Sequence, residues 1–485
     1  MAVTINGHEE TIPLRGAGAT DWLRQLYYRQ SGKPANAQAV QDALNLIRAR
    51  ALYDGEEHEV HVRVAGGHGV IYLDLADGAG RVVAITEDGW TVIDSCPLRF
   101  IRPKGLLPLP LPAHGGSIDD LRPFVNVSDD DQFRLMVSWL VAALSPWGPY
   151  PILQLAGQQG SAKSTTARVL RSLVDPNVSP LRSEPREARD LMIAATNAHV
   201  VTFDNISRMP SYMSDALCRL ATGGGFSTRQ LYTDGEEVIF EGMAPVILTG
   251  IEEQAERGDL VERSIIITLP PISDAERRTE RTVRKDFEAA APRILGALLD
   301  ALVLVVRHRD AIELPGRPRM ADFAVTAAAA APELGWDLEQ FLLAYQGNRD
   351  AAKASTVESS SLALAVVQFM ESRTEYSATA SELKDELELV VGEQVVRRRT
   401  WPKDATRLSG ELRRLAPSLE ALGVHVVFGE REPGRARRRL ITLERMADVA
   451  VPVSAASDSN QGENEDVDAG GRYSVCRRSV RVTHA

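Results

Sequence analysis

A short apolar run that leads through a glycine-containing turn into a helix constrains the fold of this chain most strongly. The run PILQL ends at Leu155, the turn GQQGSAKS occupies residues 157–164, and STTARVLRSLV continues with helical spacing. A strand, a glycine turn and a helix in this order form a phosphate-binding loop, because the turn aims backbone N–H groups and the positive end of the helix at one point. The sequence therefore predicts an α/β unit with a largely parallel sheet around this turn.

The turn has the groups that a nucleoside triphosphate and Mg²⁺ require. Lys163 would reach the β and γ phosphates, and the hydroxyl group of Ser164 would bind Mg²⁺. Ala162 departs from the pattern GxxxxGK[ST], which has glycine there, and its methyl group would crowd the backbone. An ordinary helix cap beside a solvated lysine is the alternative. The predicted binding residues are Gly157, Gln158, Gln159, Gly160, Ser161, Ala162, Lys163, Ser164 and Thr165.

Two later apolar runs each end in a polar residue suited to the same site. HVVTFDN ends its run at Asp204, whose carboxylate we expect on the strand adjacent to the loop, facing Mg²⁺ opposite Ser164. PVILTG contains Thr249, which could contact the γ-phosphate or the attacking water. A turn aspartate that ends a strand is the alternative for Asp204.

Two further positions bear on hydrolysis. Asn205 stands where a glutamate often polarises the attacking water, so turnover would be slow unless Asp215 or Glu252 takes that role. Arg263, in DLVERSIIITLP, is the first candidate for an arginine supplied to a neighbouring subunit, and Arg257 is the second. A surface salt bridge is the alternative for either arginine.

Together these segments resemble the ATPase domain of superfamily-three helicases of the AAA+ class, particularly the poxvirus-type and phage primase-helicases, and a group of actinobacterial and phage ATP-binding proteins. The resemblance rests on GQQGSAKS, VVTFDN, LCRLATGGGFSTRQLYTDGEEVIF, PVILTG and DLVERS, across about residues 150–270. It implies a homo-oligomeric ring, such as a hexamer, in which residues 222–232 form a hairpin that grips single-stranded DNA. Arg229 and Tyr232 would then provide charge and a stacking surface; a plain hairpin is the alternative.

The C-terminal part of the chain is locally basic. Residues 395–445 contain thirteen Lys or Arg against six Asp or Glu, whereas the whole chain carries a net charge of −11. A helical segment followed by a hairpin with a basic tip is typical of a winged helix that binds DNA, although a solvated charged face is the alternative. The candidate DNA contacts are Arg407, Arg413 and Arg414 on the helix and Arg435, Arg437 and Arg438 in the wing, with Lys403 and Arg439 beside them.

The remaining patterns mark the boundaries of the predicted domains and indicate which classes of protein the chain does not belong to. The predicted core is an α/β P-loop NTPase of AAA+ type. Three distant cysteines indicate neither a disulfide framework nor a zinc site, which fits a reducing cytoplasm. The apolar stretch 294–306 is too short to cross a bilayer and contains Asp300, so we expect a buried helix. The predicted units are an α+β domain at 1–105, a linker at 106–118, an ATPase domain with a helical annex at 119–350, a winged-helix-like domain at 355–445 and a disordered tail at 446–485.

These expectations favour an ATP- and Mg²⁺-dependent motor that acts on DNA in the replication of a phage or another mobile element. An ATP-gated DNA-binding switch or loader with slow turnover is the first alternative. An NTPase that serves phage defence or element maintenance with a protein partner is the second.

Overall fold

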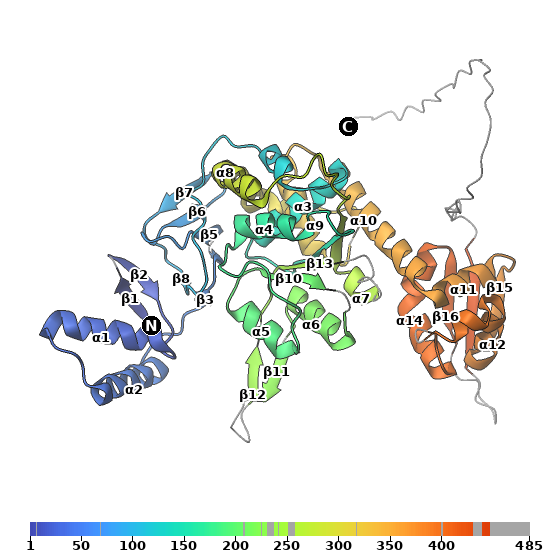
Figure 1. Ribbon diagram of the computed structural model, residues 1–485, viewed down its shortest axis with the longest axis horizontal. Coiled ribbons are helices and arrows are strands. Elements are labelled where there is room, and N and C mark those ends of the chain that lie inside the picture. The colour runs from blue at the N-terminus through green and yellow to red at the C-terminus, as the bar shows by residue number, and fades with distance from the viewer. Residues whose placement is uncertain are drawn as a thin grey trace, which may run out of the picture.

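The computed structural model describes residues 1–446 except 6, 68, 207–208, 225, 230–236, 241, 251–257, 317, 399–400 and 430–438. A large central body lies between a small N-terminal appendage and a C-terminal helical unit, which joins the body through one long helix (Figure 1). The predicted tail lies outside the described residues from 447 onward.

The N-terminal region consists of a strand hairpin, two helices and an antiparallel meander. Helices and strands are both present in this region, but the meander does not have a core of its own, because Ile71, Val83 and Trp90 belong to the same buried cluster as the central helices. The elements are β1 (Ala2–Ile5), β2 (His8–Thr11), α1 (Ala17–Ser31), α2 (Ala37–Tyr53), β3 (Val60–His61), β4 (Val64–Gly67), β5 (Val70–Asp74), β6 (Val82–Ile85), β7 (Trp90–Ile93) and β8 (Arg99–Phe100).

A four-stranded parallel sheet forms the centre of the body, with the order β10-β13-β9-β14. The predicted mixed α/β architecture with a parallel sheet is confirmed. One expectation about the order was wrong, since β13 lies between the strand before the loop and the strand that carries Asp204. The sequence around β9 and β10 does not show that another strand separates them, because β13 follows both strands in the chain. The strands are β9 (Ile152–Ala156), β10 (Val201–Ile206), β13 (Val246–Gly250) and β14 (Ser264–Thr268).

Helices surround this sheet. Residues Ile294 to Val305 of α8 are largely buried, which confirms the predicted buried helix. By length and composition alone this helix could cross a membrane, but 61% of its apolar window is buried in the body. The helices are η1 (Ile118–Phe124), α3 (Asp130–Ala143), α4 (Lys163–Val174), α5 (Ala188–Thr196), α6 (Ser211–Thr222), α7 (Gly258–Val261), α8 (Glu280–His308), η3 (Arg309–Ala311) and α9 (Ala321–Ala330).

A hairpin is present in this region, but its two strands span residues 226–240 and not the predicted 222–232, whose first residue ends α6. β11 (Phe226–Arg229) pairs with β12 (Glu237–Phe240) in antiparallel register, and the pair extends away from the body below α5 and α6 (Figure 1). The backbone of Arg229 therefore belongs to a strand, whereas Tyr232 lies outside the described residues.

The C-terminal unit has its own buried cluster, which includes Leu362, Leu383 and Leu412. Its antiparallel sheet has the order β15-β17-β16, and β16 and β17 are the predicted strand pair. The tip between them lies outside the described residues. The elements from the connecting helix onward are α10 (Leu338–Ser359), α11 (Ser361–Met370), β15 (Glu375–Thr379), α12 (Ala380–Val391), α13 (Glu393–Val396), α14 (Ala405–Ala421), β16 (Val424–Phe428) and β17 (Leu440–Arg445).

Candidate functional site

The predicted phosphate-binding turn joins β9 to α4 and has the backbone of a glycine-rich loop. Gly157 has a φ of 143°, and a Cβ atom there would lie 2.5 Å from the carbonyl oxygen of Leu269, so only glycine fits. Ala162 has a φ of 62°, the left-handed conformation that glycine adopts without strain. Alanine therefore supports the same backbone path as the glycine of the pattern, at a cost of about 1 kcal/mol.

Lys163 is the first residue of α4, and its side chain folds back over the turn. Its Nζ donates to the carbonyl oxygens of Gly157 at 2.6 Å and Gln158 at 2.7 Å. Partial burial lowers the pKa of Lys163, and the nearby carboxylate of Asp204 partly offsets this effect. An anionic phosphate group is a stronger partner for an ammonium group than a neutral carbonyl, so the lysine is placed to exchange one for the other.

The structure brings Ser164, Asp204 and Thr249 together at the carboxyl ends of the strands. The hydroxyl group of Ser164 donates to Asp204 Oδ1 at 2.7 Å, and the hydroxyl group of Thr249 makes a very short hydrogen bond to the same oxygen. One carboxylate beside a hydroxyl fits Mg²⁺, which usually binds one or two carboxylates and completes its shell with water and substrate phosphates. The described residues contain no group of three or more His, Cys, Asp or Glu that would form an all-protein metal cage.

Asn205 sits at an irregularity in β10. Its φ is 56°, the register with β13 shifts between Phe203 and Ile206, and its backbone N–H donates to the Thr249 hydroxyl group at 2.9 Å. The side chain of Asn205 is exposed. Of the two substitute acids, Asp215 lies on α6 and Glu252 falls outside the described residues. Only the backbone of Asn205 thus contacts a residue of the site, and its role in hydrolysis stays a prediction.

Arg263 lies at the far end of the sheet from the loop of its own chain. Its carbonyl accepts from Ile152 at the start of β9, and its Nη1 donates to the carbonyl oxygen of Asp259 at 2.8 Å. A five-residue strand separates the two ends by about 16 Å. Only contact with another copy of the chain would bring Arg263 to a nucleotide. Arg257 lies outside the described residues.

Two residues near the loop were missed by the sequence reasoning. Asn126 donates from Nδ2 to the carbonyl oxygens of Ser161 at 3.1 Å and Pro270 at 2.6 Å, and so fixes the turn against the end of β14. The guanidinium group of Arg277 lies against Gly160, with Nη2 3.4 Å from the position of a Cβ atom there. Neither residue belongs to a local motif, so only the folded chain reveals it.

The candidate DNA contacts of α14 do not share one face. Arg407 and Arg414 are separated by two turns and lie on one side, where Asp404 and Glu411 pair with them at 3.5 and 3.9 Å. Arg413 turns to β16 and covers the ring of Phe428 at 4.5 Å. The helix also packs against α10 and α7, which reduces its free surface. The wing candidates Arg435, Arg437 and Arg438 lie outside the described residues.

A buried ion pair links the N-terminal meander to both elements of the candidate site. Arg63 is fully buried and donates to Asp175 Oδ1 at 3.3 Å and to the carbonyl oxygens of Asp74 and Leu107. Asp175 ends α4, and its Oδ2 accepts from the backbone of His199 and Val200, just before β10. Burial lowers the pKa of Arg63, and the two neighbouring carboxylates counteract that shift. The pair therefore ties together the helix that carries Lys163 and the strand that carries Asp204.

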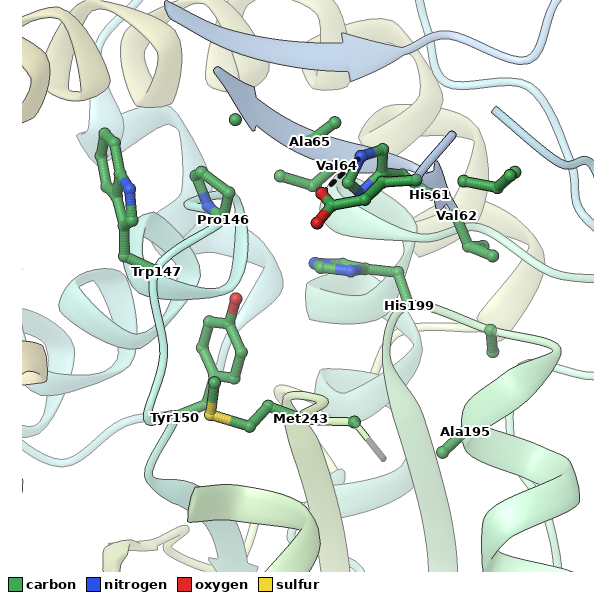
Figure 2. Close-up of a pocket in the computed structure, with 15 residues that line it drawn as sticks. His61, Val62, Val64, Ala65, Pro146, Trp147, Tyr150, Ala195, His199 and Met243 are labelled. Carbon is green, nitrogen blue, oxygen red and sulfur yellow. Dashed lines mark ion pairs between the residues drawn. The ribbon is translucent and has the colours of Figure 1, made fainter. Parts of the chain in front are cut away.

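A separate pocket of about 480 Å³ opens at the opposite edge of the sheet from the loop. Figure 2 shows His61 on one wall, Tyr150 and Met243 on the other, and His199 between them. Met243 follows β12, so the pocket adjoins the base of the β11–β12 hairpin as well as the N-terminal strands. None of the predicted nucleotide-binding residues lines it.

Comparison with known protein families identifies most of the chain. Residues 118–350 match the model of the actinomycete integrative conjugative element replication protein, and residues 362–459 match the model of the C-terminal domain of the same protein, RepA. Together the two matches cover about two thirds of the chain. The chain belongs to this family of replication proteins. It is a replication protein of an actinomycete integrative conjugative element, which is one of the mobile elements that the sequence pointed to.

The family match overturns the resemblance to superfamily-three and poxvirus-type or phage primase-helicases. The segments that carried the resemblance are a strand, a glycine turn and polar residues at neighbouring strand ends. Phosphate-binding α/β units in general share these features. Two positions within these segments depart from the expected pattern, Ala162 in the turn and Asn205 after Asp204. The resemblance was therefore wrong as a family assignment.

Solved structures similar to this replication protein include three of the apo C-terminal region of NrS-1. They are 10–11% identical in sequence, with TM-scores of 0.36–0.39, and the alignments cover 92% of this chain and 93–94% of those chains. A likeness at this level is too weak to carry an argument about fold or activity. No protein of curated function matches the chain.

Proposed function

We propose that this replication protein binds Mg²⁺ and ATP at residues 157–164 and couples ATP hydrolysis to movement on the DNA of its element. The observation that carries the proposal is the convergence of Ser164, Asp204 and Thr249 on one point beside Lys163. These residues come from three separate elements, which an ordinary helix cap would not bring together.

Each residue has a distinct task in this proposal. The backbone of the turn and Lys163 hold the phosphates, and Ser164 and Asp204 hold Mg²⁺. Thr249 fixes the carboxylate of Asp204 and the backbone of Asn205 at the same time. Bound ATP would supply the free energy of phosphate hydrolysis.

DNA contact and oligomerisation are parts of the same proposal. The net positive charge of residues 395–445 favours phosphate contacts. Arg229, whose backbone belongs to β11, is a further candidate, as is Tyr232, which lies outside the described residues. The distance of Arg263 from its own loop favours an assembly in which a neighbouring copy supplies the arginine. A homo-oligomeric ring would meet that requirement.

The exposed amide of Asn205 favours a second candidate function. Without an acid at that position the site would hydrolyse ATP slowly, and bound ATP would then act as a switch that retains the protein on DNA or loads it there. The motor and the switch use the same nucleotide site and differ in turnover.

An ATPase assay with and without single-stranded DNA, combined with strand displacement, tests both candidates. DNA-stimulated hydrolysis with displacement supports the motor, whereas ATP-dependent DNA retention without displacement supports the switch. Lys163→Ala should abolish both, and Lys33→Ala, an exposed lysine far from the turn, serves as the matched control. If labelled ATP fails to bind at millimolar Mg²⁺, or if Lys163→Ala binds it normally, the nucleotide site is refuted.

A further inference from the structure

The segment that follows β14 is fastened to the phosphate-binding turn. The backbone N–H of Ile272 donates to the carbonyl oxygen of Gly160 at 3.4 Å, and Asn126 bridges Ser161 and Pro270. These contacts hold residues 270–272 against the turn. The position of Arg277, a few residues further on, is therefore coupled to the turn.

The guanidinium group of Arg277 lies beside the turn, and its ion pair with Asp274 is weak enough for another anion to replace Asp274. Its Nη2 is 3.4 Å from the position that a Cβ atom of Gly160 would occupy. Its Nη1 lies 3.1 Å from Asp274 Oδ1, and the side chains of this ion pair are 57% and 95% exposed. Exposed pairs of this kind contribute less than about 1 kcal/mol, so a phosphate group can displace Asp274 at little cost.

The charges of the site require another cation. The positive charge of Lys163 in the turn is offset by the negative charge of Asp204 on β10. A nucleoside triphosphate remains anionic after Mg²⁺ binds. An arginine is suited to the remaining charge, because its planar donors match phosphate oxygens. Arg277 adjoins Gly160, in the part of the turn that precedes Lys163.

We infer that Arg277 is a phosphate-contacting residue of the nucleotide site and makes the site prefer a triphosphate to a diphosphate. The inference rests on the proposed nucleotide site and adds the residue that senses the terminal phosphate. Arg277 pairs with Asp274 in the structure, and contact with the phosphate would require the guanidinium group to turn away from Asp274.

The test is a comparison of equilibrium binding of a non-hydrolysable ATP analogue and of ADP, each with Mg²⁺. Arg277→Gln should weaken binding of the ATP analogue by about tenfold to a hundredfold, as expected for a lost charged hydrogen bond, and ADP by no more than about threefold. Arg277→Lys should retain part of the preference. Arg284→Gln is the control, because Arg284 is exposed and pairs only with Glu288 among the described residues.

The outcomes separate this inference from the proposed function. If the unaltered protein binds neither nucleotide, the proposed nucleotide site itself fails. If it binds both and Lys163→Ala binds neither, but Arg277→Gln leaves the ratio of the two affinities unchanged, only the inference about Arg277 is overturned. An equal loss of both nucleotides also overturns it, since the contact would then be with a phosphate that ATP and ADP share.

Discussion

Replacing Arg63 with methionine should destabilise the central body strongly, because the carboxylate of Asp175 would remain buried without its main cation. Removing one member of a buried ion pair costs about 3–5 kcal/mol. Arg171 Nη2 stays 4.0 Å from Asp175 Oδ2, so we expect the lower end, about 3 kcal/mol. In a unit of this size that corresponds to a fall of roughly 6–12 °C in the midpoint of thermal unfolding.

Scanning calorimetry measures this shift directly. Arg99→Met is the matched control, because Arg99 forms a partly exposed pair with Glu9 at 2.9 Å and its loss should cost less than about 1 kcal/mol. The double variant Arg63→Met with Asp175→Asn should be more stable than Arg63→Met alone, since it removes the uncompensated charge. The reasoning is refuted if Arg63→Met unfolds at the same temperature as the control, or if the double variant is no more stable than the single one.

Three further predictions follow from the described contacts. Ala162→Gly should raise the free energy of unfolding by about 0.5–1 kcal/mol, measured by denaturant titration, because it relieves a left-handed alanine; a loss of stability would contradict this account of the turn. Arg407→Gln and Arg414→Gln should weaken DNA binding by a similar factor for every DNA sequence. Each should also reduce the slope of log affinity against log salt concentration by about 0.9, and an unchanged slope would exclude the residue as a phosphate contact. Burial lowers the pKa of His199, whose Nε2 lies 2.6 Å from the carbonyl oxygen of Ala143, so unfolding takes up a proton and stability should fall as the pH drops below about 6.5. Unfolding midpoints at about pH 7.5 and about pH 5.5 should differ less in His199→Gln than in the unaltered protein.

The sequence predicted the parts of the site that depend on short patterns. The turn at 157–164 and the residues Asp204 and Thr249 each follow an apolar run, and the carboxyl ends of parallel strands meet at one edge of a sheet. The run lengths and glycine spacing therefore sufficed to place these side chains near one another. The same reasoning predicted the strand pair of the C-terminal unit, whereas a hairpin at 222–232 was only implied by the resemblance, and the observed strands lie at 226–229 and 237–240.

The rest depends on long-range packing that no local pattern records. The position of β13 between β9 and β10 is set by how the chain returns to the sheet, and Asn126 and Arg277 approach the turn only through that fold. The meander β4–β7 shares the central core, and the contact between Arg63 and Asp175 joins the meander to α4 across a long stretch of chain. The family assignment failed for a related reason, since the segments that carried it are common to many phosphate-binding units.

The central location of β13 sets an order for assembly during synthesis. β9 and β10 cannot become neighbours in the sheet, so the strand that carries Asp204 has no place beside the turn until residues Val246–Gly250 have left the ribosome and paired on both sides. Nascent chains that stop short of residue 250 would therefore contain the turn and the aspartate but not the contact between them.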